Sequence, residues 1–320
     1  MTGILFITAP IFLLVALGFV LVKAELIPAA WLPALGGYVI RVALPAQLFR
    51  SLTQRALSDV IDLRYLLAYA GGSLTVLAAT LLWARYLRRE SLERAAIMAM
   101  GTSCSNSAFI GYPIALQVVG PVAGTALALC ATVENVLILP LCLALADAGS
   151  ASHEPFARAF GRAFAGLRHN PMVLAIGAGL LCSALHIVVR PPFVRAIDML
   201  AGSSAPVALF VIGGILVGLP RRDMSLDVYA VGVGKLLLHP LAVAAGLLLF
   251  APADPMLRVA ALVIASAPML SVYPILGGRH ALSGFCAAAL VVATLASAVT
   301  MSATIWLLQS GHVVTLRQGR

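Results

Sequence analysis

Charged side chains are scarce in this sequence. Asp, Glu, Lys and Arg supply 10% of its 320 residues, whereas hydrophobic residues supply 62% and the mean hydropathy is +1.03. Soluble globular domains carry about 25% charged residues. The shortage of charge therefore excludes an ordinary water-soluble domain.

The few charges are also clustered, which leaves long stretches without any. No Asp, Glu, Lys or Arg occurs in residues 3–22, 65–84, 95–133, 199–220 and 259–278. About 20 consecutive apolar residues can cross the hydrocarbon core of a bilayer as a helix, and the stretch 95–133 is long enough for two crossings. The pattern predicts an all-α, multi-pass protein of the inner (plasma) membrane, surrounded by the lipid bilayer.

The residues that metal centres and enzymes require are missing as well. The five cysteines lie in apolar stretches, none forms a CxxC pair, and none lies near a histidine at the spacing of metal ligands. There is no HExxH or GxSxG motif and no pair of intramembrane aspartates. We therefore expect no cofactor, no metal and no enzymatic activity, and we interpret the cysteines as small buried hydrophobic residues.

The formal net charge of +9 has a membrane explanation. The basic residues lie between apolar stretches and form no basic face with interleaved aromatic residues, so we expect no nucleic-acid binding. Cytoplasmic loops of membrane proteins are enriched in Lys and Arg. An N-terminus outside the cell places 11 of them on the cytoplasmic side and 8 on the other, a small margin in favour of that orientation. The N-terminus lacks the basic region of a signal peptide, so we expect its apolar stretch to be retained as the first helix.

Hydropathy and helix breakers predict ten transmembrane helices. The expected ranges are 3–23, 33–53, 64–87, 94–117, 121–146, 170–189, 194–219, 227–250, 257–277 and 281–309. The one long polar connection is 147–168. It predicts a first unit over 1–146 with helices 1–5, a second unit over 169–310 with helices 6–10, and a short tail over 311–320.

The two units resemble each other when the chain is compared with itself at an offset of 161 residues. Pro10 then coincides with Pro171, Pro45 with Pro206, and Pro113 with Pro274. The last pair lies in two Tyr-Pro-Ile triplets. Because each unit has an odd number of helices, the second must enter the membrane in the opposite sense, as in the inverted repeats of secondary transporters.

Both Tyr-Pro-Ile triplets lie where a proline interrupts helical hydrogen bonding, because Pro113 removes the partner of the Phe109 carbonyl and Pro274 that of Leu270. Non-helical backbone at membrane depth is tolerated where protein or a water-filled cavity surrounds it. We expect helices 4 and 9 to be broken and to cross near the midplane, with half-helix N-termini that favour an anion. The alternative is a pair of ordinary proline kinks. The residues predicted here to contact substrate are Ser105, Asn106, Tyr112, Pro113, Pro268, Ser271, Tyr273 and Pro274.

Polar residues deep in the predicted helices are further candidates, because such groups are costly in a membrane. Arg41 could bind a carboxylate with its guanidinium group, or reach the membrane boundary instead. Gln47 could donate a hydrogen bond to substrate. Glu134, next to Asn135, is a candidate coupling residue that carries a proton, since burial disfavours a charged carboxylate; the alternative is a structural partner for a nearby hydroxyl or for Lys235.

The stretch NSAFIGYPI at 106–114 resembles the fourth-helix motif of the auxin efflux carrier family, in which an Asn precedes a Pro by seven residues. Similar segments follow in order at LPAQLF (44–49), HNP (169–171), APVALFVIGGIL (205–216), KLLLHPL (235–241), ASAP (265–268) and GGRHALSG (277–284). The set covers nearly the whole chain. One departure is MLSV at 269–272, where many members of the family have an Asn.

The resemblance implies ten helices in two inverted five-helix repeats, with helices 4 and 9 crossing at prolines. Asn106 and Pro113 match the first crossing segment, and Pro268 matches the second. The resemblance also implies an elevator-type carrier of organic acids, which are auxin in plants and malonate or malate in bacteria, and a homodimer. Residues and resemblance together predict a secondary active transporter of small organic anions, coupled to H⁺ or Na⁺. The alternatives are a membrane-embedded enzyme and a facilitator or channel without ion coupling.

Overall fold

The computed structural model describes residues 2–53, 62–150, 155–187, 189–215, 217, 225–252 and 254–310. Over these ranges the regular secondary structure is helical, apart from one isolated β-bridge. The predicted tail 311–320 lies outside the described residues. So do part of the predicted linker and five basic residues used for orientation, Arg55, Arg221, Arg222, Arg317 and Arg320.

The helices follow the hydropathy pattern closely. The chain up to residue 150 forms α1 (Thr2–Lys23), α2 (Leu32–Tyr38), α3 (Leu44–Thr53), α5 (Leu63–Leu82), α6 (Leu92–Ser103), α7 (Tyr112–Val119), α8 (Val122–Thr132) and α9 (Leu139–Gly149). The rest forms α10 (Phe156–Ala165), α11 (Pro171–Ala184), α12 (Pro191–Ile215), α13 (Leu226–Val233), α14 (His239–Phe250), α15 (Pro255–Ala265), α16 (Tyr273–Gly278) and α17 (Ser283–Ser310).

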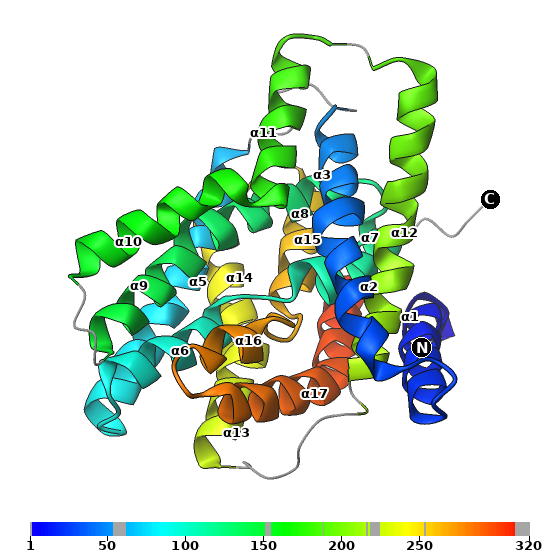
Figure 1. Ribbon diagram of the computed structural model, residues 1–320. Helices are drawn as coiled ribbons and strands as arrows, with labels where there is room; N and C mark the ends of the chain where they lie inside the picture. Colours follow the sequence, from blue (N-terminus) through cyan, green and yellow to red (C-terminus); the bar gives the residue numbers. More distant parts are fainter. Residues whose placement is uncertain are drawn as a thin grey trace.

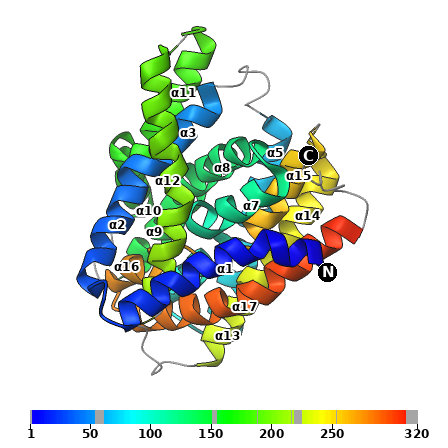
Figure 2. The same ribbon diagram turned by 90° about the vertical axis from the view of Figure 1, so that its right-hand side faces the viewer.

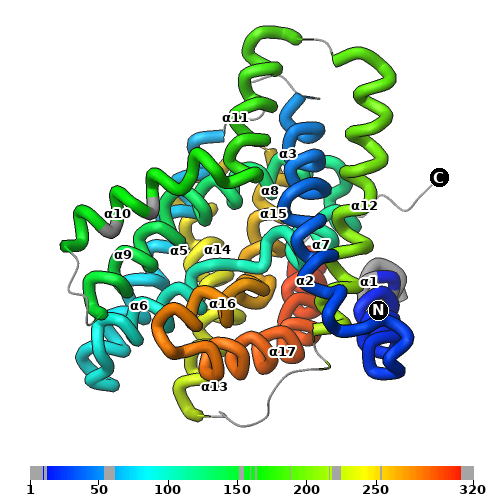
Figure 3. The backbone as a smooth tube through the Cα atoms, in the orientation of Figure 1, coloured from blue at the N-terminus to red at the C-terminus, as the bar shows by residue number. Residues whose placement is uncertain are grey.

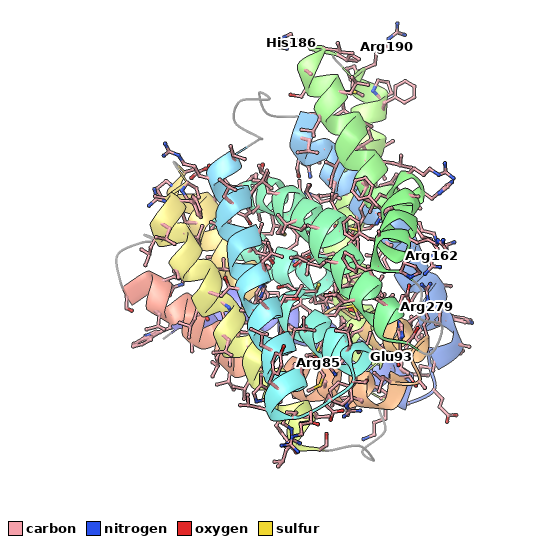
Figure 4. The ribbon with its side chains drawn as sticks, turned by 90° about the vertical axis from the view of Figure 1, so that its left-hand side faces the viewer. Arg85, Glu93, Arg162, His186, Arg190 and Arg279 are labelled. Atoms are coloured by element: carbon pink, nitrogen blue, oxygen red, sulfur yellow. The ribbon has the colours of Figure 1, made fainter. Side chains whose placement is uncertain are left out.

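Within the described residues, six continuous helical segments are long and apolar enough to cross a membrane. They are Ala29–Thr53, Leu63–Leu87, Val122–Gly149, Pro191–Ile215, Leu226–Phe250 and Ser283–Ser310. Shorter apolar helices at Leu13–Lys23, Ser107–Val119, Pro171–Ala184 and Pro255–Ala265 fall in the other predicted ranges. Large hydrophobic side chains also face outward, such as Leu248 with 84% of its surface exposed. Figure 4 shows His186 and Arg190 at the top of the view, Arg85 and Glu93 toward the bottom, and Arg162 and Arg279 at one side between them.

The helices form two bundles that meet side by side (Figure 1). In the first bundle, α1 packs against α12, and α3 packs against both α11 and α12, as Figure 2 shows from a second direction. In the second bundle, α5 packs against α14 and α6, α6 against α9, α15 against α7 and α8, and α17 against α13 and α16. Contacts between α3 and α8 join the two bundles.

Glycines bring pairs of these helices unusually close together. A Cβ atom on Gly18 of α1 would overlap the carbonyl oxygen of Phe210 in α12. A Cβ atom on Gly179 of α11 would lie 2.9 Å from the Leu52 Cβ and 3.4 Å from the Phe49 carbonyl oxygen in α3. Because small residues let backbones pack without side chains between them, these positions fix the geometry of the first bundle.

Four membrane helices change to π-helical hydrogen bonding just before a proline. The π segments are Val39–Ala43 before Pro45, Ser107–Gly111 before Pro113, Val133–Ile138 before Pro140, and Gly234–Leu238 before Pro240. A proline has no N–H and its ring crowds the carbonyl four residues earlier, and a wider turn relieves both problems. The prolines therefore bend these helices without ending them. Four polar residues of interest, Arg41, Glu134, Asn135 and Lys235, lie in these segments.

The predicted polar linker contains a helix. In α10, Phe156, Phe160 and Phe164 stack along one face, with ring centroids 5.8 and 6.3 Å apart. Arg162 on α10 pairs with Asp147 of α9 at 2.7 Å. The amphipathic pattern and the ion pair hold α10 against α9, and α10 leads the chain into the N-terminus of α11.

Candidate functional site

The first helix interruption lies between α6 and α7. Helix α6 ends at Ser103, residues 104–106 are non-helical, and helical structure resumes at Ser107. Figure 3 shows the chain leaving its helical path here. The interruption is buried, with Asn106 only 3% exposed.

The second interruption lies between α15 and α16, over residues 266–272. The two interruptions cross, because Ser105 and Met269 form an antiparallel β-bridge. The Asn106 backbone N–H donates to the Pro268 carbonyl at 2.7 Å, and its side-chain Nδ2 donates to the Ser271 hydroxyl at 2.7 Å. The first interruption thus donates hydrogen bonds to acceptors of the second, so that polar groups of both are paired, as burial in an apolar medium requires.

The crossing differs in one detail from the expectation that the prolines mark the breaks. Pro113 and Pro274 lie in the first turn of α7 and α16, downstream of the non-helical residues. The Leu270 carbonyl, expected to lose its partner, accepts a hydrogen bond from the Tyr273 N–H at 3.1 Å. Pro274 fits there because a helix does not use the N–H groups of its first turn, whereas Pro113 is accommodated by the wider turn of the π segment Ser107–Gly111 that precedes it.

A cavity of about 360 Å³ lies against the crossing. Its lining includes Ser105–Phe109 of the first interruption, Leu270–Val272 of the second, Glu134 and Asn135 of the π segment between α8 and α9, and His169–Met172 at the start of α11. We call it the crossing cavity. Its volume lies in the range of small-molecule sites, and its wall combines apolar side chains with a few polar groups.

One wall of the crossing cavity is a helix N-terminus. Ser107, Ala108 and Phe109 begin the helical segment that continues into α7, and all three line the cavity. The first N–H groups of a helix have no partner within the helix. Asn106 precedes this segment, and its side chain donates to Ser271 and makes no capping bond. This wall therefore presents hydrogen-bond donors and the positive end of a helix dipole to a ligand.

Glu134 is buried behind this wall, with 2% of its surface exposed. One carboxylate oxygen accepts hydrogen bonds from the Ser105 N–H at 3.0 Å and the Tyr69 hydroxyl at 2.9 Å. The other accepts a short hydrogen bond from the Ser107 hydroxyl. The carboxyl group is therefore connected directly to the first interruption, at two residues that also line the cavity.

Lys235 connects the two interruptions from the far side. Its Nζ donates to the Ser105 hydroxyl at 2.9 Å and to the Ala265 carbonyl, the last of α15, at 2.7 Å. It also lies 2.8 Å from Nδ1 of His239, whose Nε2 lies 2.9 Å from the Ser73 hydroxyl. These contacts use all three donors of an ammonium group. A buried cation at the carbonyl end of a broken helix also opposes the negative end of its dipole.

Two further cavities flank the crossing. A larger one, of about 1080 Å³, is lined by Lys23, Arg41 and the loop that joins α1 to α2, and it shares Ser271 and Val272 with the crossing cavity. The second, of about 350 Å³, is lined by Gln47, Tyr112 and residues of α12, near the opposite ends of the helices. We call them the wide cavity and the narrow cavity.

The predicted residues divide among these places. The structure gathers Ser105, Asn106, Ser271, Glu134 and Asn135 around the crossing cavity, and Pro268 accepts a hydrogen bond beside it.

The other predicted residues lie elsewhere. Arg41 is exposed in the wide cavity. Gln47 donates to the Ser51 hydroxyl at 3.0 Å and lines the narrow cavity with Tyr112. Tyr273 is buried and donates to the Ile97 carbonyl at 2.9 Å. Pro113 and Pro274 shape α7 and α16.

Three residues of the crossing cavity were missed by the sequence reasoning: Ser107, His169 and Asn170. The pattern Asn-Pro at 170–171 is typical of a helix start, and Asn170 does cap α11 by accepting from the Met172 N–H at 3.0 Å. That signal locates the residue at a helix N-terminus. It does not reveal that this N-terminus lies beside the fourth and ninth predicted helices.

Comparison with known proteins gives two sequence matches. Residues 4–159 match the family model described as "Membrane transport protein". The chain is also similar to a protein of Rhizobium meliloti (strain 1021) named "Putative malonate transporter", with 26% identity over 304 residues, which cover 94% of this chain and 95% of the relative. Both matches are to membrane transport proteins, and together with the long apolar helices they support a multi-pass membrane protein that is a transporter.

Proposed function

We propose that the chain is a secondary active transporter of small organic anions, mono- or dicarboxylates such as malonate or malate, and that it binds them in the crossing cavity. The observation that carries this proposal is the helix N-terminus at Ser107–Phe109, which lies beside Asn106 in a largely apolar cavity. Free backbone N–H groups and a helix dipole favour a carboxylate there. The name of the Rhizobium meliloti relative supports the same substrate class.

The proposal includes two inverted repeats of five helices, over 1–146 and 169–310. The glycine contacts support it. Gly18 meets Phe210, and Gly179 meets Phe49, so the same contact recurs after a shift of 161 residues in both partners. Tyr112–Pro113 and Tyr273–Pro274 likewise occupy the same places in α7 and α16. This offset equals the one that aligns the prolines of the two halves.

An elevator mechanism fits the two bundles. The second bundle carries both broken helices, whereas the first supplies α1, α2, α3, α11 and α12 as a wall beside them. The wide cavity reaches the crossing from the end that carries the loop between α1 and α2, and the narrow cavity lies toward the other end. With the N-terminus outside, the wide cavity opens to the cytoplasm. Movement of the second bundle along the first would exchange which end of the crossing is accessible.

Glu134 is our candidate for coupling to H⁺, with Asn135 beside it. Its carboxyl group accepts three hydrogen bonds from groups of the first interruption and Tyr69. A charged Glu134 would repel an anion in the adjacent cavity, so anion binding favours its protonated form. The transporter would therefore carry a proton together with the anion.

The test is uptake of labelled malonate and malate by proteoliposomes that contain the purified protein. Asn106→Ala should reduce uptake at least tenfold, because losing a hydrogen bond to a charged group costs about 1.5–3 kcal/mol. Thr75→Ala is the matched control, since the Thr75 hydroxyl bonds only to the Gly71 carbonyl of its own helix. Uptake of neither acid by the wild type, or full uptake by the Asn106 variant, would contradict the proposal.

A facilitator without coupling is the second candidate function. The variant Glu134→Gln distinguishes a facilitator from a proton-coupled transporter. Gln keeps the shape and most hydrogen bonds of the side chain but cannot exchange a proton. In a proton symporter, an inward proton gradient accelerates wild-type uptake and leaves uptake by the Gln variant unchanged. If neither a proton gradient nor a Na⁺ gradient affects uptake by the wild type, the uncoupled function is correct.

A further inference from the structure

We propose that the crossing cavity has a second polar end, formed by Asn135, Asn170 and His169, which binds the far carboxylate of a dicarboxylate and so makes the site selective for dicarboxylates. The inference rests on the proposed function of this cavity as an organic-anion site. It adds the substrate class and the residues that select it.

These three residues come from a different part of the fold than the crossing. Asn135 lies in the π segment that joins α8 to α9, in the second bundle, and His169 and Asn170 immediately precede α11, in the first bundle. All three line the same 360 Å³ cavity as Asn106 and Ser107. One cavity thus has polar side chains supplied by two separate groups of elements.

The hydrogen bonds of the two amides leave donors available. Asn170 Oδ1 accepts from the Met172 N–H at 3.0 Å, and Asn170 Nδ2 donates to Asn135 Oδ1 at 3.3 Å. Asn135 Nδ2 in turn donates to the Ala131 carbonyl at 2.8 Å. An amide NH₂ group has two hydrogens, so each side chain keeps one N–H beyond these contacts. Both amide oxygens are already engaged, which leaves this end of the cavity with donors for an anion.

The charges around the cavity fit a doubly charged ligand. Among the described residues that line it, Glu134 is the one acidic side chain, and both of its oxygens accept hydrogen bonds from the first interruption or Tyr69. His169 is exposed at the edge of the cavity and adds ring N–H capacity. A monocarboxylate at Asn106 and Ser107 would leave the second set of donors without a partner. A dicarboxylate satisfies both sets.

The test compares malonate with malonamate, which has the same size but carries a neutral amide in place of one carboxylate. Both are measured as competitors of labelled malonate uptake in proteoliposomes. Wild-type protein should bind malonate about tenfold or more tightly than malonamate, since a hydrogen bond to a charged group is stronger than one to a neutral group.

Two variants at Asn170 preserve the helix cap and change only the second polar end. Asn170→Asp keeps an oxygen that caps α11 but places a negative charge near the far carboxylate, whereas Asn170→Ser keeps the cap and removes the amide donor. Asn170→Asp should weaken malonate binding about tenfold or more and malonamate binding less than about threefold. Asn170→Ser should reduce the preference in the same direction by a smaller factor. His169→Gln should leave most of the preference in place.

The control is Asn106→Ala, which should weaken both ligands by similar factors because it acts on the carboxylate they share. If both Asn170 variants keep the wild-type ratio of malonate to malonamate affinity, the second polar end does not bind the far carboxylate. The proposed function is unaffected by that result. If wild-type protein binds malonamate as tightly as malonate, the site is not selective for dicarboxylates. The proposal that the crossing cavity binds organic anions is unaffected by that result. If neither compound competes, and neither malonate nor malate is taken up, the proposed function fails and this inference fails with it.

Discussion

The two interruptions occupy corresponding helices but are built differently. The first is three residues long, and its side chains and N–H groups contact Glu134, Lys235 and Tyr69. The second spans seven residues and contributes acceptors, the Pro268 carbonyl and the Ser271 hydroxyl, and the Ala265 carbonyl lies just before it at the end of α15. A repeat can thus keep its geometry while its two copies diverge in chemistry. The first copy supplies most of the polar side chains, and the second supplies acceptors that hold the crossing together.

The largest expected effect comes from removing the residue that serves both interruptions. Lys235→Met leaves the Ala265 carbonyl and the Ser105 hydroxyl without their donor and leaves Glu134 without a nearby buried cation. Each buried polar group left without a partner costs about 1–3 kcal/mol, so we expect a large loss of stability in detergent. Thermal unfolding of purified protein measures it.

Lys23→Met is the control for that experiment, because Lys23 is exposed and its ammonium group lies 5.5 Å from the centre of the Phe19 ring. It should unfold near the wild-type temperature. Adding Glu134→Gln to Lys235→Met should recover part of the loss, since the double variant has no unpaired buried charge. A Lys235 variant as stable as wild type would show that the two interruptions do not depend on this contact.

The next effect tests the asymmetry directly. Asn106 and Ser271 share one hydrogen bond across the crossing, so a purely structural role predicts equal losses on removing either side chain. If the first interruption carries the ligand donors, Asn106→Ala should reduce malonate uptake at least tenfold and Ser271→Ala only about twofold to threefold. Uptake rates, normalised to the amount of folded protein, distinguish the purely structural role from the ligand-binding role of the first interruption. Equal losses would mean that the two interruptions contribute equally to transport.

Much of this architecture could be predicted from the sequence, because hydropathy and proline positions act locally. The ten apolar stretches, the interruption of the fourth and ninth, and the position of Asn106 at the first interruption all follow from residues within one helix. The residues at which each helix is interrupted could not be predicted from the sequence. A proline in the first turn of a helix and a proline in its interior look alike in sequence, and only the neighbouring helix decides which one occurs.

The rest of the site depends on contacts between distant segments. Asn170 lies beside Asn135 because α10 carries the chain back along α9 to the start of α11. Tyr273 shares the Tyr-Pro motif with Tyr112, yet its hydroxyl reaches α6 and not a cavity. Pairings of this kind are set by packing between bundles. Sequence periodicity within one helix carries no record of them.

A smaller effect is expected at the contact between α6 and α16, two helices that flank the interruptions. A Cβ atom on Gly101 of α6 would lie 2.6 Å from the Tyr273 hydroxyl oxygen and 2.8 Å from the ring carbon that bears it. Gly101→Ala should therefore displace this phenol, weaken its bond to the Ile97 carbonyl, and lower the free energy of unfolding by about 1–3 kcal/mol. Thermal unfolding in detergent measures the loss.

Gly37→Ala is the matched control, because a Cβ atom there meets nothing within 4 Å. It should be neutral or slightly stabilising, since alanine restricts the unfolded chain more than glycine does. Tyr273→Phe should cost about 1 kcal/mol by itself, and it should lessen the further cost of Gly101→Ala by removing the atom that clashes most. Additive losses in the double variant would mean that this contact does not couple the two interruptions.

The smallest effect distinguishes the two prolines that first suggested the repeat. Pro274 occupies the first turn of α16, where the lost N–H is not needed, and Pro113 is accommodated by the π segment before it, so replacing either by alanine should change stability by less than about 1 kcal/mol. Transport should separate them. Pro113 follows the π segment Ser107–Gly111, which begins at the cavity wall, and alanine would let that segment relax to ordinary α-helical bonding. This relaxation rotates Ser107 and Ala108 relative to the crossing cavity.

Pro274 follows a loop that has no such strain to release. We therefore expect Pro113→Ala to lower malonate uptake by about threefold and Pro274→Ala to leave it near the wild-type rate. The reverse order would mean that α16, and not the start of α7, positions the substrate.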